Sequence, residues 1–264
     1  MSKYLVLVSI ILFSYMLSPA LLHAEDATDI VKKSQNAFFY PGKDMQARVK
    51  MTLTGKTGQQ RLRELTMLRK NSDGSDQKYF IYFHSPGDVR GTSFMVYKYS
   101  GKDDDRWLFI PAINLVTRIA SRDSRSSFVG SDFTYEDVSG RDIESDNYKY
   151  VREDTLDGKP VHVIESTPKS STEYIKKISW IDKTTYIPLK EEYYDVQGSL
   201  YKVFTAEKVD TVGGLPAVTK RTMSNIKSGH RTEVVFENIS YNVGLSDDIF
   251  SERYLRKPPE KWIK

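Results

Sequence analysis

Strict alternation of apolar and polar residues over residues 44–54, "DMQARVKMTLT", is the feature that most constrains the fold. Met45 and Val49 fall in the apolar set, while Arg48 and Lys50 fall in the polar set. Successive side chains of a β-strand point to opposite faces of a sheet, whereas a helix repeats its apolar positions every three or four residues. The pattern therefore predicts a strand with one buried face.

Turn signals separate further strand-like segments along most of the chain. Asp157-Gly158, Gln197-Gly198 and Gly213-Gly214 each lie between two such segments. Glycine supplies the positive φ that tight hairpins require, and these hairpins join antiparallel neighbours. We therefore expect a mainly β fold with roughly ten to twelve strands.

Helical segments are expected at both ends and in the middle of this sheet. Residues 26–39 have capping residues, an apolar stripe and a Pro-Gly stop, and residues 246–255 predict a second helical piece. Residues 121–142 are long and lack a strand pattern, which predicts one or two short helices lying against the sheet. Segments 78–83 and 107–116 are apolar on both faces, so both faces of their strands must be covered.

The N-terminal residues predict export. Lys3 precedes an apolar run over residues 4–17, and Ser18-Pro19-Ala20 begins a small-residue exit. This pattern is typical of a signal peptide, with cleavage expected after Ala24 and, as the second choice, after Ala20. The alternative, a membrane anchor, would need about 20 apolar residues. We therefore expect residues 25–264 to form one domain in the periplasm.

Composition excludes several classes of function. The 264-residue chain has no cysteine, which removes disulfides, thiolate nucleophiles, zinc–thiolate sites and the lipid-attachment cysteine of a bacterial lipoprotein. Its net charge is +4, but the two signs are mixed along the chain. Without a basic stripe, we expect no binding to nucleic acid.

Candidate metal ligands and catalytic groups are scattered. His84, His162 and His230 are far apart in the sequence and lack the spacing of metal motifs. The adjacent acids 103–105 predict a solvated turn, because calcium loops interleave their acids with other residues. We expect no metal site and no cofactor.

The segment "FVGSDFTYEDVSG", residues 128–140, resembles an active-site loop in its composition. Asp132, Glu136 and Asp137 could form an acid pair for glycoside hydrolysis, but we find no partner histidine or metal motif beside them. The other interpretation is a structural lid held by Arg–carboxylate pairs, which leaves the protein without catalytic residues. The arginines that flank the acids are Arg118, Arg122, Arg125 and Arg141. The lid residues are Phe128, Gly130, Asp132, Phe133, Tyr135, Glu136 and Asp137.

The central block resembles the LolA-like family of outer-membrane lipoprotein-sorting proteins. The similarity lies in "SPGDVRGTSF", "DDDRWLFIPA" and "GSDFTYED", and it continues through "ISWIDKTTYIPLKEEYYD". The resemblance implies a strongly curved, incomplete antiparallel β-barrel, closed by helices around an apolar cavity. It also implies carriage of lipid or acylated lipoprotein, with transient membrane contact. An inner-membrane RND-type transporter is an implied partner.

An acyl chain in water costs about 0.8 kcal/mol per CH₂, so such a carrier needs an apolar shield. The alternatives to the carrier are an exporter-associated interaction module with a collapsed cavity, and a hydrolase that uses the acids of the 128–140 segment. The residues expected to line the cavity are Val49, Met51, Leu53, Leu65, Met67, Phe80, Tyr82, Phe94, Val96, Trp107 and Phe109.

Overall fold

The computed structural model describes residues 26–72, 76–170 and 172–263. The signal peptide expected at residues 1–24 lies outside these residues. Within them the chain forms one 13-stranded antiparallel sheet with short helices at its ends and in its middle. None of the described helices has the length and apolar character needed to cross a membrane.

The strands follow one another as a meander. They are β1 (Asp44–Thr54), β2 (Gln60–Asn71), β3 (Gln77–Ser85), β4 (Ser93–Lys98), β5 (Asp105–Ile110), β6 (Leu115–Ile119), β7 (Asp146–Leu156), β8 (Lys159–Pro168), β9 (Tyr174–Asp182), β10 (Pro188–Asp195), β11 (Leu200–Val212), β12 (Leu215–Asn225) and β13 (His230–Tyr241).

The helices are mostly one turn long. They are α1 (Ala27–Phe39), η2 (Pro111–Ile113), η3 (Ser121–Asp123), η4 (Phe128–Gly130), α2 (Tyr135–Ser139), η5 (Ile143–Ser145), η6 (Asp247–Ile249), α3 (Glu252–Arg256) and α4 (Glu260–Ile263).

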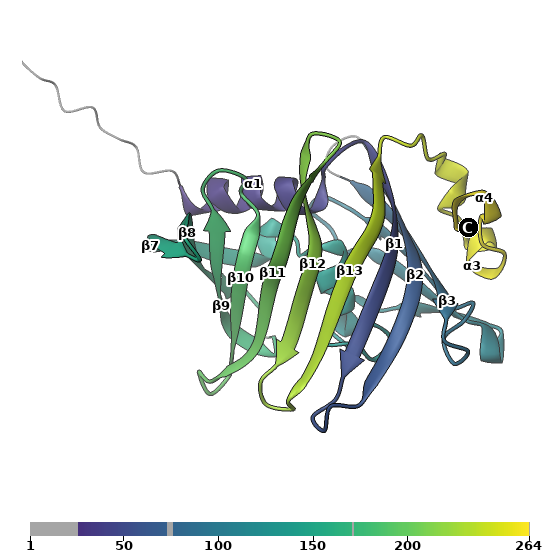
Figure 1. Ribbon diagram of the computed structural model, residues 1–264, viewed down its shortest axis with the longest axis horizontal. Coiled ribbons are helices and arrows are strands. Elements are labelled where there is room, and N and C mark those ends of the chain that lie inside the picture. Colours follow the sequence, from purple (N-terminus) through teal and green to yellow (C-terminus); the bar gives the residue numbers. More distant parts are fainter. Residues whose placement is uncertain (1–25, 73–75, 171, 264) are drawn as a thin grey trace, which may run out of the picture.

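The first and last strands pair with each other, so the two edge strands at opposite ends of the strand order are β6 and β7. The strand order is β6-β5-β4-β3-β2-β1-β13-β12-β11-β10-β9-β8-β7, with Val49 of β1 facing Phe236 of β13 and Leu65 of β2. The sheet curves into an unclosed half-barrel (Figure 1). This confirms the expected curved, incomplete antiparallel barrel with an N-terminal helix.

Residues 120–145, here called the lid, connect the two edge strands β6 and β7. They form η3, η4, α2 and η5, so the segment that lacks a strand pattern is helical as expected, with four short helices where one or two were predicted. The expected number of strands was too low. Residues 107–116 form two strands and not one, because Pro111 begins the short helix η2 and interrupts the ladder.

The concave surface of the sheet, here called the inner face, carries the largest apolar cluster. Alternate residues of β1 to β4 supply most of it, and lid side chains pack onto them. The strand residues of this cluster are Met45, Ala47, Val49, Met51, Leu53, Leu65, Met67, Tyr79, Ile81, Phe83, Phe94 and Val96.

The convex surface, here called the outer face, is covered over β2 to β5 by the C-terminal residues 243–263. Leu68, Phe80, Met95 and Phe109 of the sheet pack with C-terminal residues that include Phe250. In Figure 1 the yellow helices α3 and α4 lie beside β3, outside the half-barrel. This C-terminal cover was missed in the sequence, where the N-terminal helix and residues 121–142 were the expected covers.

Four of the residues expected to line the interior lie on the outer face. The side chains that pack with the C-terminal cluster are those of Phe80, Tyr82, Trp107 and Phe109. The alternate residues of β3, which are Tyr79, Ile81 and Phe83, face inward. The prediction failed here because β3 and β5 are apolar on both faces, so alternation alone does not tell which face is concave. The other seven residues of the expected lining lie in the inner cluster.

Asp44 fastens the C-terminal cover to the start of β1. Its buried carboxylate accepts hydrogen bonds from the backbone N–H groups of Val243 (2.6 Å), Gly244 (2.9 Å) and Leu245 (2.8 Å). Hydrogen bonds to a charged group are stronger than neutral ones, and three converge here. One side chain therefore fixes where the chain leaves β13 for the outer face.

We predict that Asp44→Ala lowers the free energy of unfolding by about 3 kcal/mol, because three backbone donors lose their acceptor together. Urea unfolding followed by tryptophan fluorescence measures this, since Trp107 and Trp262 lie in the outer cluster. The control Asp103→Ala removes an exposed carboxylate and should change stability by less than about 0.5 kcal/mol. Equal effects of the two substitutions would contradict the assignment.

Candidate functional site

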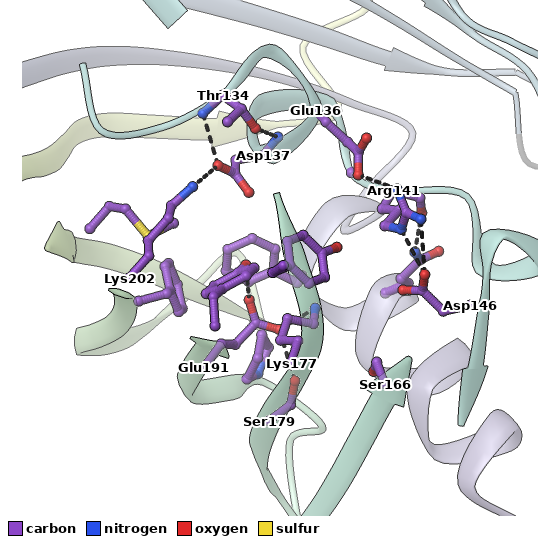
Figure 2. A pocket seen from close by; sticks show the side chains of 18 of the residues that line it. Thr134, Glu136, Asp137, Arg141, Asp146, Ser166, Lys177, Ser179, Glu191 and Lys202 are labelled. Atoms are coloured by element: carbon purple, nitrogen blue, oxygen red, sulfur yellow. Dashed lines mark hydrogen bonds and ion pairs between the residues drawn. The ribbon is translucent and has the colours of Figure 1, made fainter. Parts of the chain in front are cut away.

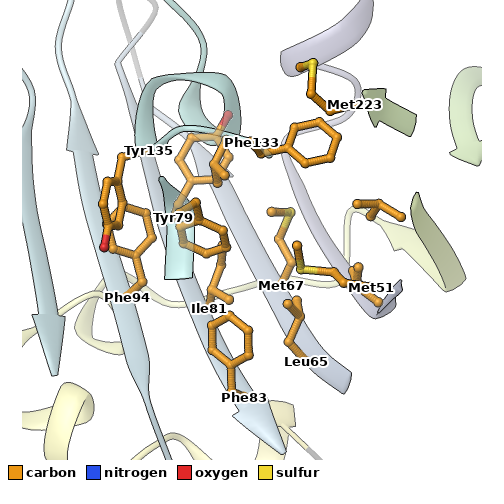
Figure 3. Close-up of a cluster of buried hydrophobic side chains, with 14 of the residues drawn as sticks. Met51, Leu65, Met67, Tyr79, Ile81, Phe83, Phe94, Phe133, Tyr135 and Met223 are labelled. Carbon is orange, nitrogen blue, oxygen red and sulfur yellow. The ribbon is translucent and has the colours of Figure 1, made fainter. Parts of the chain in front are cut away.

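The lid fills the apolar half of the interior with aromatic rings. The Phe128 ring lies 5.9 Å from that of Phe83 and 5.3 Å from that of Phe94, and Tyr135 lies 5.1 Å from Phe94. Figure 3 shows the Tyr135 ring beside Phe94, and Phe133 above Met67. These lid rings occupy the concave surface that an apolar ligand would need.

Little free space is left under the lid. The cavity between the inner face and Phe128, Phe133 and Val138 measures about 20 Å³, which is room for about one water molecule and far too little for an acyl chain. The expected open, apolar hollow is therefore absent from this half of the described structure. An acyl chain and the lid rings exclude each other.

The turn that carries Phe128 has a strained backbone, and a side chain of the sheet binds it. Val129 has φ +48° and is followed by Gly130 at φ +73°. A β-branched residue rarely adopts a positive φ, because its side chain crowds the backbone. Arg63 of β2 donates a hydrogen bond to the carbonyl oxygen of Val129, which holds the strained turn against the inner face.

A second cavity of about 120 Å³ lies between α1, the lid and strands β7 to β12, and many of its lining side chains are charged. Figure 2 shows its side chains converging from the lid and from the strands. Its charged lining residues are Arg125, Glu136, Asp137, Arg141, Asp146, Glu173, Lys177, Glu191, Lys202 and Arg221. The interior therefore has an apolar half and a polar half.

Helix α2 presents Asp137 to this cavity. Thr134 and Asp137 form a capping box, with hydrogen bonds of 2.8 and 3.0 Å between each side chain and the other's backbone N–H. Lys202 of β11 donates to the same carboxylate at 2.7 Å, with side chains 8% and 17% exposed. Burial opposes ionisation of Asp137, but Lys202 and Thr134 outweigh it and hold its pKa below the ordinary value.

Arginine–carboxylate pairs hold the lid, but only two of the four flanking arginines, Arg125 and Arg141, take part. Glu136 accepts from Arg141 at 2.8 Å and from Arg125 at 3.4 Å, and Arg141 also reaches Asp146 at 2.9 Å. Figure 2 shows Arg141 between the two acids.

The other two flanking arginines do not contact the lid acids. Arg118 pairs with Asp105 across the β5–β6 hairpin, and Arg122 lies exposed beside Asp123. Asp104, next to Asp105, is buried in an ion pair with Arg106 at 2.6 Å. The acids of residues 103–105 are thus partly structural and do not form a uniformly solvated turn.

Strands β9 and β10 contribute a partly buried pair that the sequence analysis missed. Lys177 donates to Glu191 at 2.7 Å, and Ser179 and Tyr193 donate to the same carboxylate at 3.0 and 2.9 Å. Burial alone would lower the pKa of Lys177, but Glu191 raises it. The signal was present in the sequence, because Lys177 and Ser179 alternate on one face of a strand, but the direction of that face was unknown.

Asp132 has a histidine partner after all, which corrects the sequence analysis. His230 Nδ1 lies 2.6 Å from its carboxylate, and Thr232 donates to it at 2.8 Å. Both partners come from β13, 98 and 100 residues away in the sequence. No serine hydroxyl is hydrogen-bonded to the His230 ring in the part of the chain that the structure describes, so the group has no nucleophile placed as in a hydrolase triad.

The other two histidines of the described residues lie in separate places. His84 Nε2 lies 2.9 Å from Thr66 Oγ1, and burial lowers its pKa to about 4. His162 Nδ1 lies 3.3 Å from the hydroxyl of Tyr150. Among the described residues, no three acidic or histidine side chains gather as metal ligands.

Comparisons with known proteins place this geometry in a family. A family model with the description "Uncharacterized protein" matches residues 75–257. A DUF1329 family protein from Desulfovibrio piger is 29% identical, with a TM-score of 0.81 over 87% of this chain and 97% of that one. The chain belongs to the family that this model describes.

Two further solved structures show that its fold is LolA-like. A structure described as an outer membrane lipoprotein-sorting protein domain, from Vibrio parahaemolyticus, is 29% identical with a TM-score of 0.81, covering 87% of this chain and 98% of that chain. A LolA superfamily protein from Nitrosomonas europaea shares the fold at 22% identity, with a TM-score of 0.69 over 88% and 100% of the two chains. A comparison with curated proteins found no match.

We predict that Asp137 makes the stability of this LolA-like protein depend on acid pH. Its pKa is lower in the folded state than the value of about 3.9 in an unfolded chain. The ionised carboxylate therefore stabilises the fold at neutral pH, and this contribution is lost as the pH falls through the folded pKa. Asp137→Asn should be less stable than wild type by about 1 to 3 kcal/mol near neutral pH, and the difference should narrow towards pH 2.

Urea unfolding at several pH values measures that difference. Asp103→Asn serves as the control, because it removes one exposed negative charge from the same protein. A difference between wild type and Asp137→Asn that stayed constant with pH would show that the pairing with Lys202 does not depend on ionised Asp137.

Proposed function

We propose that this protein is a non-enzymatic periplasmic carrier that binds the acyl chain of a lipid or lipoprotein inside its half-barrel. The observation that carries the proposal is the cover of the inner face. Phe128, Phe133 and Val138 of the lid bury the apolar side chains of β1 to β4, and among the described residues no second layer of strands does so. The structure then represents the closed state, in which lid rings occupy the position of the acyl chain.

The LolA-like relatives support this proposal. The related domain from Vibrio parahaemolyticus is described as sorting outer membrane lipoproteins. At 29% identity over 87% of this chain the likeness extends beyond a shared fold. A carrier of the same general kind is therefore the natural function to test first.

The energetics allow an acyl chain to displace the lid. Burying a chain of about fifteen methylenes gains roughly 12 kcal/mol at about 0.8 kcal/mol per CH₂. Opening exposes four buried lid side chains, those of Phe128, Phe133, Tyr135 and Val138. At about 2 kcal/mol each, this costs roughly 8 kcal/mol. The strained backbone at Val129 lowers the cost of opening further, because strain is released when the turn leaves the sheet.

The lid acids have structural partners, which supports a non-enzymatic role. Asp132 binds the side chains of His230 and Thr232, and Asp137 binds Lys202 while it caps α2. A carboxylate that anchors a helix is not free to transfer protons to a substrate. The hydrolase alternative has no further support in this geometry.

Native mass spectrometry of the protein purified from the bacterial envelope tests the carrier function. We expect a bound species with the mass of a lipid or an acylated peptide, and transfer of that species from donor to acceptor vesicles. Protein that carries no such species, and that neither takes up nor transfers a fluorescent fatty acid, would contradict the proposal.

A matched pair of substitutions separates lid opening from general loosening. Phe133 of the lid and Phe109 of the outer face are buried to a similar degree, at 3% and 7% exposure. Each substitution to alanine should lower the free energy of unfolding by about 3 to 5 kcal/mol. Only Phe133→Ala should bind a fluorescent fatty acid more tightly, because only it removes a ring that competes with the acyl chain.

Fluorescence titration measures the affinity for the fatty acid. It is carried out below the temperature at which either variant unfolds. Tighter binding by both variants would indicate nonspecific exposure of the core, and unchanged binding by both would place the fatty acid outside the interior.

The second candidate function is an exporter-associated interaction module without cargo. The filled space under the lid, about 20 Å³, is the observation that favours it. An inner-membrane RND-type transporter is the proposed partner in either case. Capture of such a transporter together with absent lipid binding would favour this second candidate.

A further inference from the structure

Arg221 occupies an unusual position at the centre of the interior. It lies on β12, is 9% exposed, and points among the rings of three elements. Its guanidinium carbon is 5.4 Å from the ring centroid of Phe38, 5.3 Å from that of Phe133 and 4.9 Å from that of Phe236. Helix α1, the lid and β13 thus surround one cation.

The Arg221 guanidinium has no protein acceptor within residues 26–72, 76–170 and 172–263. No hydrogen bond or ion pair forms there, and its Nε atom is buried without a partner. Other buried arginines do have partners, since Arg63 donates to Val129, Arg69 donates to Pro41, and Arg106 pairs with an acid. Aromatic faces attract a cation but accept no hydrogen bond of ordinary strength. An unpaired buried charge is costly.

The nearby acids of the charged cavity are already engaged. Asp137 binds Lys202 and Glu191 binds Lys177, each at 2.7 Å, while Glu136 and Asp146 bind Arg141. Glu173, the remaining acid of the lining, is exposed. Within the described lining, Arg221 is therefore the cation left to compensate a negative charge from outside the protein.

Arg221 borders both halves of the interior. It lines the charged cavity of about 120 Å³, an adjoining cavity of about 60 Å³ beside α1, and the small apolar cavity under the lid. The last is also lined by Met51, Met67 and Phe133. A ligand with a negative headgroup against Arg221 would therefore direct its chain towards the apolar inner face when the lid rings leave.

We propose that Arg221 binds the oxyanion of an amphiphilic ligand, a carboxylate or a phosphate, whose acyl chain enters the space under the lid. A planar guanidinium recognises such groups with two parallel hydrogen bonds. The inference rests on the carrier function and adds the chemistry of the headgroup. Burial lowers the pKa of Arg221 to about 10, so the group still carries its charge at neutral pH.

Calorimetric titration of the full-length mature protein with matched probes tests the site. The probes are decanoate, decyl phosphate and uncharged decanol, together with acetate and inorganic phosphate as headgroups without a chain. We expect at least one anionic amphiphile to bind about tenfold or more tightly than decanol, as for hydrogen bonds to a charged group. The stronger of the two anionic amphiphiles identifies the headgroup.

The variant Arg221→Met should remove the preference for the anionic probe and leave the affinity for decanol nearly unchanged. The control Lys220→Met removes the same charge from the neighbouring residue, whose side chain pairs with Glu207 and Glu233 instead. That control should keep the preference. Its loss in Lys220→Met as well would indicate a general electrostatic effect and overturn the assignment to Arg221.

Unfolding measurements on the same variants distinguish binding from a structural role. Arg221→Met should unfold at the same urea midpoint as wild type or a higher one, because it removes an uncompensated buried charge. A lower midpoint, with weaker binding of every probe alike, would make Arg221 a structural cation and overturn the proposal.

The remaining outcomes separate the headgroup site from the carrier function. Equal affinity of wild type for decanoate, decyl phosphate and decanol would overturn the headgroup site and leave the carrier intact. Acetate or phosphate binding as tightly as the amphiphiles would indicate a free-anion site and overturn the amphiphilic ligand. Binding of no probe would overturn both proposals.

Discussion

The pairing of the first strand with the last one determines where everything else in this half-barrel lies. Because β1 pairs with β13, the first and last strands lie in the middle of the sheet. The two unpaired edges of the sheet are therefore β6 and β7. These two strands follow each other in the sequence, so the residues between them must cross the open side of the barrel. The lid is thus a consequence of strand order, and its aromatic residues allow it to seal the interior as well as to connect two edges.

The two halves of the interior are built for different contacts. Strands β1 to β4 present methionine, leucine and phenylalanine to the lid rings, whereas β9 to β12 present lysine, glutamate and arginine to α1 and α2. Arg221 lies where the two halves meet. An amphiphile has the same division into an apolar chain and a polar head, and this correspondence links the proposed carrier function to the proposed headgroup site.

Local patterns in the sequence predicted the helices and strands. Long-range pairing decided which face of each strand points inward and which side chains meet the lid. Alternation over residues 44–54 and the stop signals after residue 39 gave β1 and α1 nearly to the residue. Alternation could not orient β3, whose two faces are both apolar, so Phe80 was placed inside the barrel when it lies outside. Likewise, His230 and Lys202 meet the lid acids only because β13 and β11 curve towards them, a contact that no local pattern encodes.

Hydrogen exchange across the lid tests the central claim, that ligand and lid rings compete for one space. The account predicts that a saturating fatty acid, such as oleate, accelerates exchange of backbone amides in residues 128–139 and leaves β1 and β2 protected. Exchange in residues 128–139 that stayed unchanged or slowed when oleate bound would contradict it, because the ligand would then lie elsewhere or on top of a closed lid.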